Sequence, residues 1–393
     1  MRRAELLQGI RAMKFENIYG RFASGELSQV EAGELLGVGE RTFRRWCHRY
    51  REEGAHGLLD RRIGVAASNR ASEAEAERVE ALYRERYRGF TAKHFHEHLA
   101  RTLWFHRSYT WTKLFLQRRG LIETAPRRGA HRRKRPRRPL PGMMLHQDAS
   151  RHVWVPGLPA CDLVVTLDDA TSAIYSALLV AEEGTASSFA GLLETFGAHG
   201  LPCSLYTDRG SHYFHTPAEG GRVSRTAPTQ VGRALAQLGI EHIAAYSPEA
   251  RGRSERAFRT LQDRLPKEFA LAGITTIEAA NTWMRQTYVA RHNARFAVAA
   301  EQEGSAFVPV LGVDLREILC HEEVRVVGND NTVVLHKVRL QIPPSSLRAH
   351  YVRSGVKVRR YADGTHAVFH GPRCIGRYDQ AGVCVEQTVK QAA

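Results

Sequence analysis

The chain has 393 residues, of which 43% are hydrophobic and 25% are charged; this excludes a fibrous or largely disordered protein and predicts two to four domains. Lysine and arginine number 57 against 41 aspartates and glutamates, and the resulting net charge of +16 indicates a polyanionic partner such as nucleic acid. Because the sequence has no run of about 18 apolar residues and no secretion signal, we expect a cytoplasmic protein without a membrane segment.

The first predicted domain, residues 1–70, is a DNA-binding helix-turn-helix. An apolar helical face of Val30, Leu35 and Leu36 stops at Gly37, and a second pattern with Phe43 on its inner face follows. In such a motif the second helix enters the major groove with its cations outward. The residues expected to face DNA are Arg41, Thr42, Arg44 and Arg45. A solvated basic helix face is the alternative interpretation.

The second predicted domain, residues 71–124, is also helical. Trp111 and Phe115 lie in a candidate recognition helix with arginines nearby, so a second helix-turn-helix-like DNA-binding domain is expected, with a plain helical spacer as the alternative. The histidines of this segment, His94, His96 and His98, are expected to be surface or packing residues. The six cysteines form no CxxC pair that would complete a zinc site.

Residues 125–141 are predicted to form a basic linker. Four prolines prevent a regular helix there, and the dense arginines repel one another. Such a segment can neutralise DNA phosphates without sequence preference. Its expected DNA contacts are Arg132, Arg133, Lys134 and Arg135.

In residues 142–300 the pattern changes to three strands followed by helix, strand, helix, strand and a long helix. This order predicts a mixed five-stranded sheet covered by helices. The expected strands are 143–150, 162–171, 173–183, 203–210 and 241–248. The fold class is therefore predicted as multidomain, with an all-α N-terminal part and a central α/β core.

Residues 310–385 contain short β-rich runs joined by turn residues, which predict a small β-barrel. Its basic residues, including Arg325 and Arg359, fit a nucleic-acid surface, and a purely structural barrel is the alternative. No GxxxxGK[ST] loop occurs in the sequence, so no nucleotide cofactor is expected.

Three acidic residues occupy related places in the core pattern. Asp148 lies within the first strand, Asp208 at the end of the fourth, and Glu255 on the helix after the fifth. With the first strand central and the fourth beside it, the three carboxylates converge. Such a cluster is tolerable only with bound cations, and hard oxygen ligands select Mg²⁺ or Mn²⁺. Two such ions support in-line phosphoryl transfer, the chemistry of DNA strand cleavage and joining.

Other acids compete for these roles. Asp162 and Glu249 are alternatives for the first and third positions. Asp169 is a weaker candidate, because the Asp-Asp pair before Thr171 suits turn formation.

The sequences YTDRGSHY around Asp208 and SPEARGRSERAFRTLQ around Glu255 resemble those of the retroviral-integrase-like DDE transposases, most closely the bacterial insertion-sequence transposases of the ISNCY type. The resemblance covers nearly the whole chain. It implies an RNase H-like integrase catalytic core in which Asp148, Asp208 and Glu255 are catalytic and bind the metal. It also implies binding to terminal inverted repeats in double-stranded DNA, followed by cleavage and strand transfer. Since two DNA ends must be held together, we expect a homo-oligomer, at least a dimer.

Two departures from the family pattern affect the site. The 46 residues between Asp208 and Glu255 exceed the usual interval, which predicts an inserted loop at residues 215–230. Gln262 occupies a position where many relatives have a basic residue, so Arg259 is expected to contact DNA instead.

Relatives often have alanine at the position of Gly33, so the first helix-turn-helix is expected to be a little less stable. Two other functions are compatible with the sequence. One is a sequence-specific DNA-binding regulator with an inactive catalytic core, and the other is a metal-dependent nuclease that cuts DNA without joining it.

Overall fold

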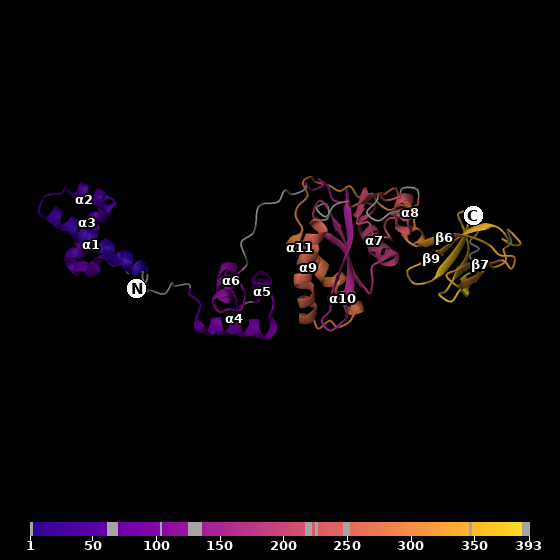
Figure 1. The fold of residues 1–393 in the computed structure, drawn as a ribbon, viewed down its shortest axis with the longest axis horizontal. Helices are drawn as coiled ribbons and strands as arrows, with labels where there is room; N and C mark the ends of the chain where they lie inside the picture. The colour runs from indigo at the N-terminus through magenta and orange to yellow at the C-terminus, as the bar shows by residue number, and fades with distance from the viewer. Residues whose placement is uncertain are drawn as a thin grey trace. The chain divides into compact units, whose positions relative to one another are not determined.

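A computed structural model of the chain (Figure 1) describes residues 3–60, 70–102, 104–124, 136–216, 222–224, 227–246, 252–345 and 348–386. The chain forms two compact units, Met1–Arg84 and Glu85–Ala393.

The first unit is helical. Its main elements are α1 (Arg3–Ala23), α2 (Gln29–Leu36), α3 (Glu40–Glu53) and the 3₁₀ turn η1 (Gly54–Leu58). Ser28 and Glu31 form a capping box at the start of α2, in which Ser28 Oγ accepts from Glu31 N and the Glu31 carboxylate accepts from Ser28 N. The helix ends at Gly37, whose φ of 69° is a conformation that glycine adopts readily. Phe15 and Phe43 lie in the buried core.

The inner face of α2 matches the predicted one only in part, because Leu36 packs against the core. Val30 and Leu35 are 53% and 46% exposed, and α2 buries Ala32 and Gly33 instead. A Cβ atom added to Gly33 would lie only 2.9 Å from the backbone oxygen of Val38. Glycine at this position therefore permits a close approach of α2 to the following turn.

Three further helices lie between α3 and the central sheet in the sequence. They are α4 (Glu73–Arg86), which crosses the division between the units, α5 (Ala92–Leu99) and α6 (Tyr109–Arg118). Thr91 caps α5 and Ser108 caps α6, each side chain accepting from the N–H three residues further on. The helix α6 corresponds to the second candidate recognition helix, and its role in DNA binding stays a prediction.

The central sheet has the predicted five strands. They are β1 (Leu145–His152), β2 (Cys161–Asp168), β3 (Ile174–Val180), β4 (Ser204–Thr207) and β5 (Glu241–Ala244), in the order β3-β2-β1-β4-β5. The strand β1 pairs antiparallel with β2, where Asp148 lies opposite Val165, and parallel with β4, where Leu145 lies opposite Leu205. The mixed sheet and the central position of β1 are therefore confirmed.

Helices cover both faces of this sheet (Figure 1). The helices are α7 (Thr185–His199), α8 (Gln230–Gln237), α9 (Gly252–Leu271), α10 (Ile277–Trp283), the π-helical turn η3 (Met284–Tyr288) and α11 (Val289–Phe296). Phe258 and Leu265 of α9 pack with α10 and η3 on one face. Phe189 and Phe196 of α7 pack with α8 on the other.

The C-terminal part is a second antiparallel sheet. It contains β6 (His321–Val326), β9 (Gly355–Arg360), β10 (His366–His370), β11 (Arg373–Tyr378) and β12 (Cys384–Glu386), with the separate hairpin β7 (Thr332–Leu335) and β8 (Val338–Gln341). The sheet and hairpin share one hydrophobic core. The predicted β-structure of this β-domain is therefore confirmed as an antiparallel sheet, and its closure into a barrel stays a prediction. None of the described helices in either unit is long and apolar enough to cross a membrane.

Two basic side chains of this β-domain, Arg325 and Arg359, pair with carboxylates of the C-terminal part. Arg359 Nε donates to Glu322 and Arg359 Nη1 donates to Glu317 of α12 (Leu315–Ile318), both at 2.9 Å. Arg325 pairs with Glu323. Arg359, which the sequence placed on a nucleic-acid surface, is only 12% exposed and ties α12 to the sheet.

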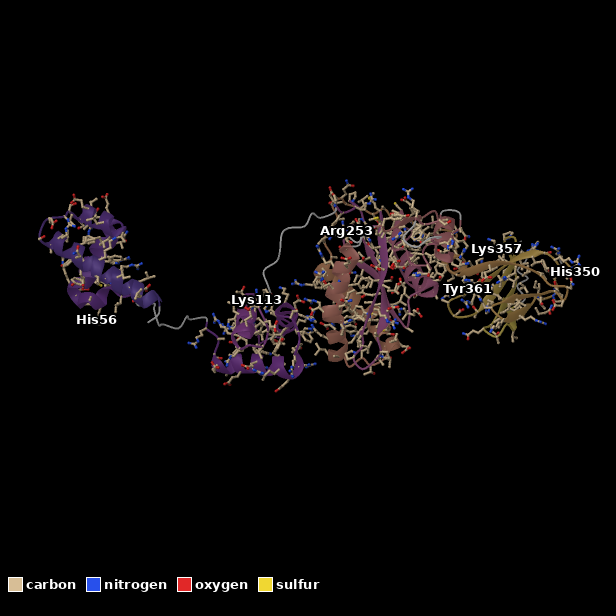
Figure 2. All side chains as sticks on the ribbon, viewed as in Figure 1. His56, Lys113, Arg253, His350, Lys357 and Tyr361 are labelled. Atoms are coloured by element: carbon tan, nitrogen blue, oxygen red, sulfur yellow. The ribbon has the colours of Figure 1, made fainter. Side chains whose placement is uncertain are left out.

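The buried His292 of α11 predicts a pH-dependent stability. Burial and the charge of Arg264 lower the pKa of His292 to about 4. The pKa of a histidine in an unfolded chain is about 6.5. The unfolded chain therefore binds more protons below about pH 6.5, and the free energy of unfolding should fall by up to about 3 kcal/mol between pH 6.5 and 4. Denaturant unfolding of the core at several pH values measures this slope. His292→Gln should flatten it, and the same change at the exposed His350 (Figure 2) should not; equal slopes in all three proteins would contradict the assignment.

Candidate active site

Asp148 lies on the face of β1 that turns toward α9. Alternation along the strand places Leu145 and Gln147 against α7 and puts Asp148 on the opposite face. Asp148 is only 7% exposed, and its Oδ1 accepts from the N–H of Ala149 at 3.0 Å. A carboxylate this deeply placed requires strong compensating interactions.

Asp208 follows directly after β4, the parallel neighbour of β1. Its Oδ1 accepts from the N–H of Gly210 at 2.8 Å, so the side chain closes a tight Asx-type turn. Thr207 Oγ1 donates to the Asp208 carbonyl oxygen at 3.0 Å and lies 3.0 Å from His242 Nε2 on β5. These contacts fix the backbone from which the Asp208 carboxylate projects.

The structure brings Asp148 and Asp208 to one small cavity of about 10 Å³. Ser254, in the first turn of α9, lines the same cavity and is buried, whereas the next residue, Glu255, is exposed. Among the described side chains, the sets of three whose ligand atoms all lie within 4.8 Å do not include Asp148, Asp208 and Glu255. Asp148 and Asp208 thus line the same cavity. Glu255 does not line it but directly follows Ser254, which does.

Asp169, predicted to serve turn formation, instead connects three segments around this cavity. Its Oδ1 accepts from His146 Nε2 on β1 at 2.8 Å and lies 2.6 Å from Arg253 Nε on α9, and its Oδ2 accepts from Arg138 N at 2.8 Å. Burial would raise the pKa of Asp169, but these hydrogen bonds and the Arg253 charge outweigh it and lower the pKa well below its usual range. The turn role belongs to its neighbour Asp168, whose Oδ2 accepts from the N–H and hydroxyl of Thr171.

Arg253, labelled in Figure 2, stands two positions before Glu255 in the first turn of α9. Its pairing with Asp169 therefore anchors the helix start that carries Glu255. This pair was not predicted, and the only signal for it in the sequence was an arginine close to a predicted catalytic acid.

The YTDRGSHY sequence contains a second anchor, the buried Tyr213. Its hydroxyl donates to Gln147 Oε1 at 3.0 Å and accepts from Ser188 Oγ at 3.1 Å. Gln147 also donates to Thr166 on β2 at 3.1 Å. This network joins the segment after Asp208 to the residue next to Asp148, and burial raises the pKa of Tyr213 well above its usual value.

The end of the predicted linker lies against the core. Arg137 Nη1 donates to the carbonyl oxygens of Asp169 and Ala170 and to Ser172 Oγ at 2.8–3.1 Å. Arg253 Nη2 donates to the Pro136 carbonyl at 2.9 Å. Arg137 is therefore engaged by the turn after β2.

The predicted DNA-contacting residues of α3 lie on its outer face. Arg41, Arg44 and Arg45 are exposed and Thr42 is half-buried. Arg44 Nη2 donates to Glu40 Oε1 at 2.8 Å in an exposed pair.

The other predicted residues have different placements. Arg259 is exposed on α9, and Gln262 donates to Ser150 Oγ on β1 at 2.9 Å. The predictions that lie outside the described residues are Arg132, Arg133, Lys134, Arg135, Glu249 and part of the inserted loop after Asp208, namely 217–221 and 225–226.

Known proteins of similar sequence decide the family. A family described as a helix-turn-helix domain matches residues 20–64, which include α2 and α3. The protein named "Putative transposase y4bF" of Sinorhizobium fredii (strain NBRC 101917 / NGR234) is 31% identical over 353 residues, which cover 88% of this chain and 76% of that protein. The chain belongs to the transposase family. The transposase for insertion sequence IS1202 of Streptococcus pneumoniae is 33% identical over 162 residues, 41% of this chain and 34% of that protein.

Solved structures resembling the transposase include two from retroviruses. The HTLV-2 integrase catalytic core domain in complex with magnesium is 16% identical, with a TM-score of 0.29 over 38% of this chain and 88% of that chain. The simian T-cell lymphotropic virus intasome in complex with the PP2A regulatory subunit B56 gamma is 14% identical, with a TM-score of 0.33 over 80% of this chain and 100% of that chain.

These relatives confirm two predictions from the sequence. The first helix-turn-helix is present, and the chain is a transposase whose central sheet has the predicted five strands. Membership of the ISNCY subgroup stays a prediction.

Proposed function

We propose that the transposase binds the terminal inverted repeats of its element and carries out metal-dependent cleavage and strand transfer with Asp148, Asp208 and Glu255. The cavity lined by Asp148 and Asp208 supports this proposal most directly, because Ser254 beside Glu255 lines it too. The neighbouring strands β1 and β4 and the start of α9 thus carry the three acids, which are far apart in the sequence.

The donor set at this cavity fits a hard divalent cation. Asp148 and Asp208 offer carboxylate oxygens, and Glu255, next to Ser254 in the first turn of α9, would offer a third, whereas zinc would favour histidine and cysteine. The cavity volume of about 10 Å³ is close to that of one water-sized sphere. Bound Mg²⁺ or Mn²⁺ would supply Lewis-acid stabilisation of the phosphoryl oxygens and activate the attacking water or 3′-hydroxyl.

The surrounding residues position these acids. The Gly210 hydrogen bond orients the Asp208 carboxylate, and the Asp169–Arg253 pair holds the helix start that carries Glu255. Rigid supports of this kind matter because displacement by about 1 Å can cost about 100-fold in rate.

The outer face of α3 is proposed to read the element ends. Arg44→Ala should weaken binding to end DNA by about 1–3 kcal/mol and reduce discrimination against random DNA, because a guanidinium in the major groove makes paired hydrogen bonds to guanine. Its exposed pair with Glu40 holds it only weakly. Fluorescence anisotropy with both DNAs measures the effect. Arg21→Ala is the matched control, since Arg21 forms a similar exposed pair with Glu26 at 2.8 Å outside α3; unchanged discrimination in Arg44→Ala would remove α3 from this role.

One incubation separates the proposal from its alternatives. The transposase is mixed with DNA carrying the element ends, target DNA and Mg²⁺ or Mn²⁺. Cleavage with strand transfer supports the proposal, cleavage alone indicates a nuclease, and binding alone indicates a regulator with an inactive core. Two ends must be joined together, so a complex of at least two protein copies is expected and sedimentation of the DNA complex tests it.

A further inference from the structure

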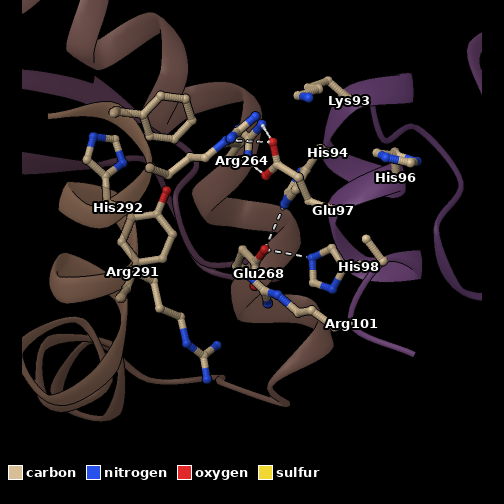
Figure 3. A pocket seen from close by; sticks show the side chains of 14 residues that line it. Lys93, His94, His96, Glu97, His98, Arg101, Arg264, Glu268, Arg291 and His292 are labelled. Carbon is tan, nitrogen blue, oxygen red and sulfur yellow. Dashed lines mark hydrogen bonds and ion pairs between the residues drawn. The ribbon is translucent and has the colours of Figure 1, made fainter. Parts of the chain in front are cut away.

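A larger cavity lies between α5 and the helices α9 and α11 (Figure 3). Its volume is about 330 Å³, at the lower end of the range for ligand pockets. The residues that line it include five lysines and arginines but only two carboxylates.

Glu97, the first of these carboxylates, is already engaged by cations. It accepts from Arg264 Nη1 at 2.7 Å and from Arg295 Nε at 3.0 Å. Burial opposes ionisation, but the two arginines outweigh it and lower the pKa of Glu97. This carboxylate therefore remains charged and has little capacity left for a further donor.

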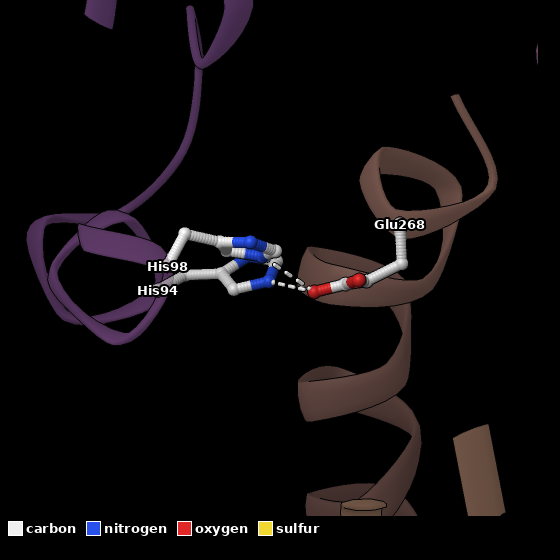
Figure 4. Close-up of side chains that lie close together, drawn as sticks. All are labelled: His94, His98 and Glu268. Atoms are coloured by element: carbon white, nitrogen blue, oxygen red, sulfur yellow. Dashed lines mark hydrogen bonds and ion pairs between the residues drawn. The ribbon is translucent and has the colours of Figure 1, made fainter. Parts of the chain in front are cut away.

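Glu268, the second carboxylate, is engaged by two histidines of α5 (Figure 4). His94 Nε2 and His98 Nε2 lie 2.7 Å and 2.8 Å from the same oxygen, Glu268 Oε1. The three ligand atoms are close enough to hold a metal ion. However, a metal on His94 Nε2 would leave a proton on Nδ1, which is buried and has no partner among the described residues. Burial lowers the pKa of His94, so the neutral ring donates to Glu268 instead.

The polar groups that remain at the cavity can donate hydrogen bonds. Arg101, after α5, and Arg291, on α11, are exposed and have no ion-pair partner in the described part of the chain. The Tyr288 hydroxyl and His292 Nδ1 are buried without a partner among the described residues. Tyr288 ends the π-helical turn η3, and such turns occur frequently at functional sites.

We propose that this cavity binds one phosphodiester group of a DNA strand, with Arg101 and Arg291 contacting its oxygens. A phosphodiester accepts hydrogen bonds without donating any, so it matches a site whose own carboxylates are already satisfied. The Tyr288 hydroxyl donates from the buried wall. The inference rests on the proposed action on DNA and adds a backbone contact away from the cleavage site.

The test compares full-length variants for binding to a random-sequence duplex at several salt concentrations, without divalent metal. The double variant Arg101→Gln/Arg291→Gln should bind about tenfold more weakly at low salt. Its slope of log affinity against log salt should be smaller by about 1, as expected for one lost phosphate contact. Arg291→Lys should keep most of the slope. Arg285→Gln is the matched control, because Arg285 is exposed on the same helical run and does not line the cavity.

Phosphate-ethylation interference and calorimetry distinguish the source of the phosphate. Interference at a phosphate in the wild-type complex that is absent with the double variant supports the proposal. The proposal is overturned if the double variant keeps the wild-type salt slope and interference pattern. It is also overturned if calorimetry shows micromolar binding of inorganic phosphate or pyrophosphate while the variants bind DNA like the wild type. Thermal unfolding of the double variant should match that of Arg285→Gln. Since neither binding assay requires strand cleavage, failure of cleavage would overturn the proposed function and leave this result intact.

Discussion

Replacing Asp208 with asparagine is expected to abolish strand cleavage and transfer while leaving binding to the element ends within about twofold. Asparagine keeps the Oδ1 acceptor for the Gly210 N–H, which lies at 2.8 Å, so the turn after β4 should persist. It removes the negative charge that a divalent cation requires. Losing several kcal/mol of transition-state stabilisation should reduce the rate by roughly 1,000-fold or more.

Two measurements decide this prediction. Strand cleavage is followed on labelled end DNA with Mg²⁺ and with Mn²⁺, and binding is followed by anisotropy without metal. Asp263→Asn is the matched control, because it makes the same chemical change on α9, where Asp263 pairs with Lys267. If Asp208→Asn cut at the rate of this control, Asp208 would have no catalytic role.

Replacing Asp169 with alanine is expected to destabilise the core by about 3–5 kcal/mol, the usual effect of leaving a buried charge without its partner. The Asp169 side chain is 1% exposed and that of Arg253 is 14% exposed. Arg253→Ala should cost less, because His146 Nε2 and Arg138 N still donate to the Asp169 carboxylate.

A double-mutant cycle separates the Asp169–Arg253 pair from general damage. Denaturant unfolding of the two single variants and Asp169→Ala/Arg253→Ala should give a coupling energy of at least about 1 kcal/mol. A control cycle on the more exposed Arg285–Glu194 pair, 3.2 Å apart, should give less than about 1 kcal/mol. Equal coupling in the two cycles would mean that Asp169 does not anchor α9 through Arg253.

Local patterns predicted most of the elements of this transposase. The alternation of strand and helix patterns gave the mixed sheet with β1 at its centre, because short buried strands and amphipathic helices have distinct periods. Gly37 marked the end of α2, since its left-handed conformation suits glycine. The error at Val30 and Leu35 has the same local origin: apolar residues on a short helix do not specify which side the neighbouring helices cover.

The supporting contacts of the site could not be predicted in this way. Asp169 looked like a turn residue because the adjacent Asp168 does cap the turn, and nothing local distinguishes the two. His94 meets Glu268 across 174 positions of sequence, so a single sequence gives no sign of the pairing. The three predicted acids are tied to recognisable elements, with Asp148 within β1, Asp208 directly after β4 and Glu255 in the first turn of α9. Their catalytic role stays a prediction.

The ion pairs of α5 have a consequence for protein engineering. Glu97 and Glu268 each receive their partners across the boundary between a small helical segment and the long helices behind the sheet. A chimera in which a foreign DNA-binding domain replaces everything before residues 125–135 would lack α5. Glu268 would then lose His94 and His98, and Arg264 would lose Glu97. A junction in residues 61–69 avoids this loss. There the first helix-turn-helix domain can be exchanged while α5 is retained.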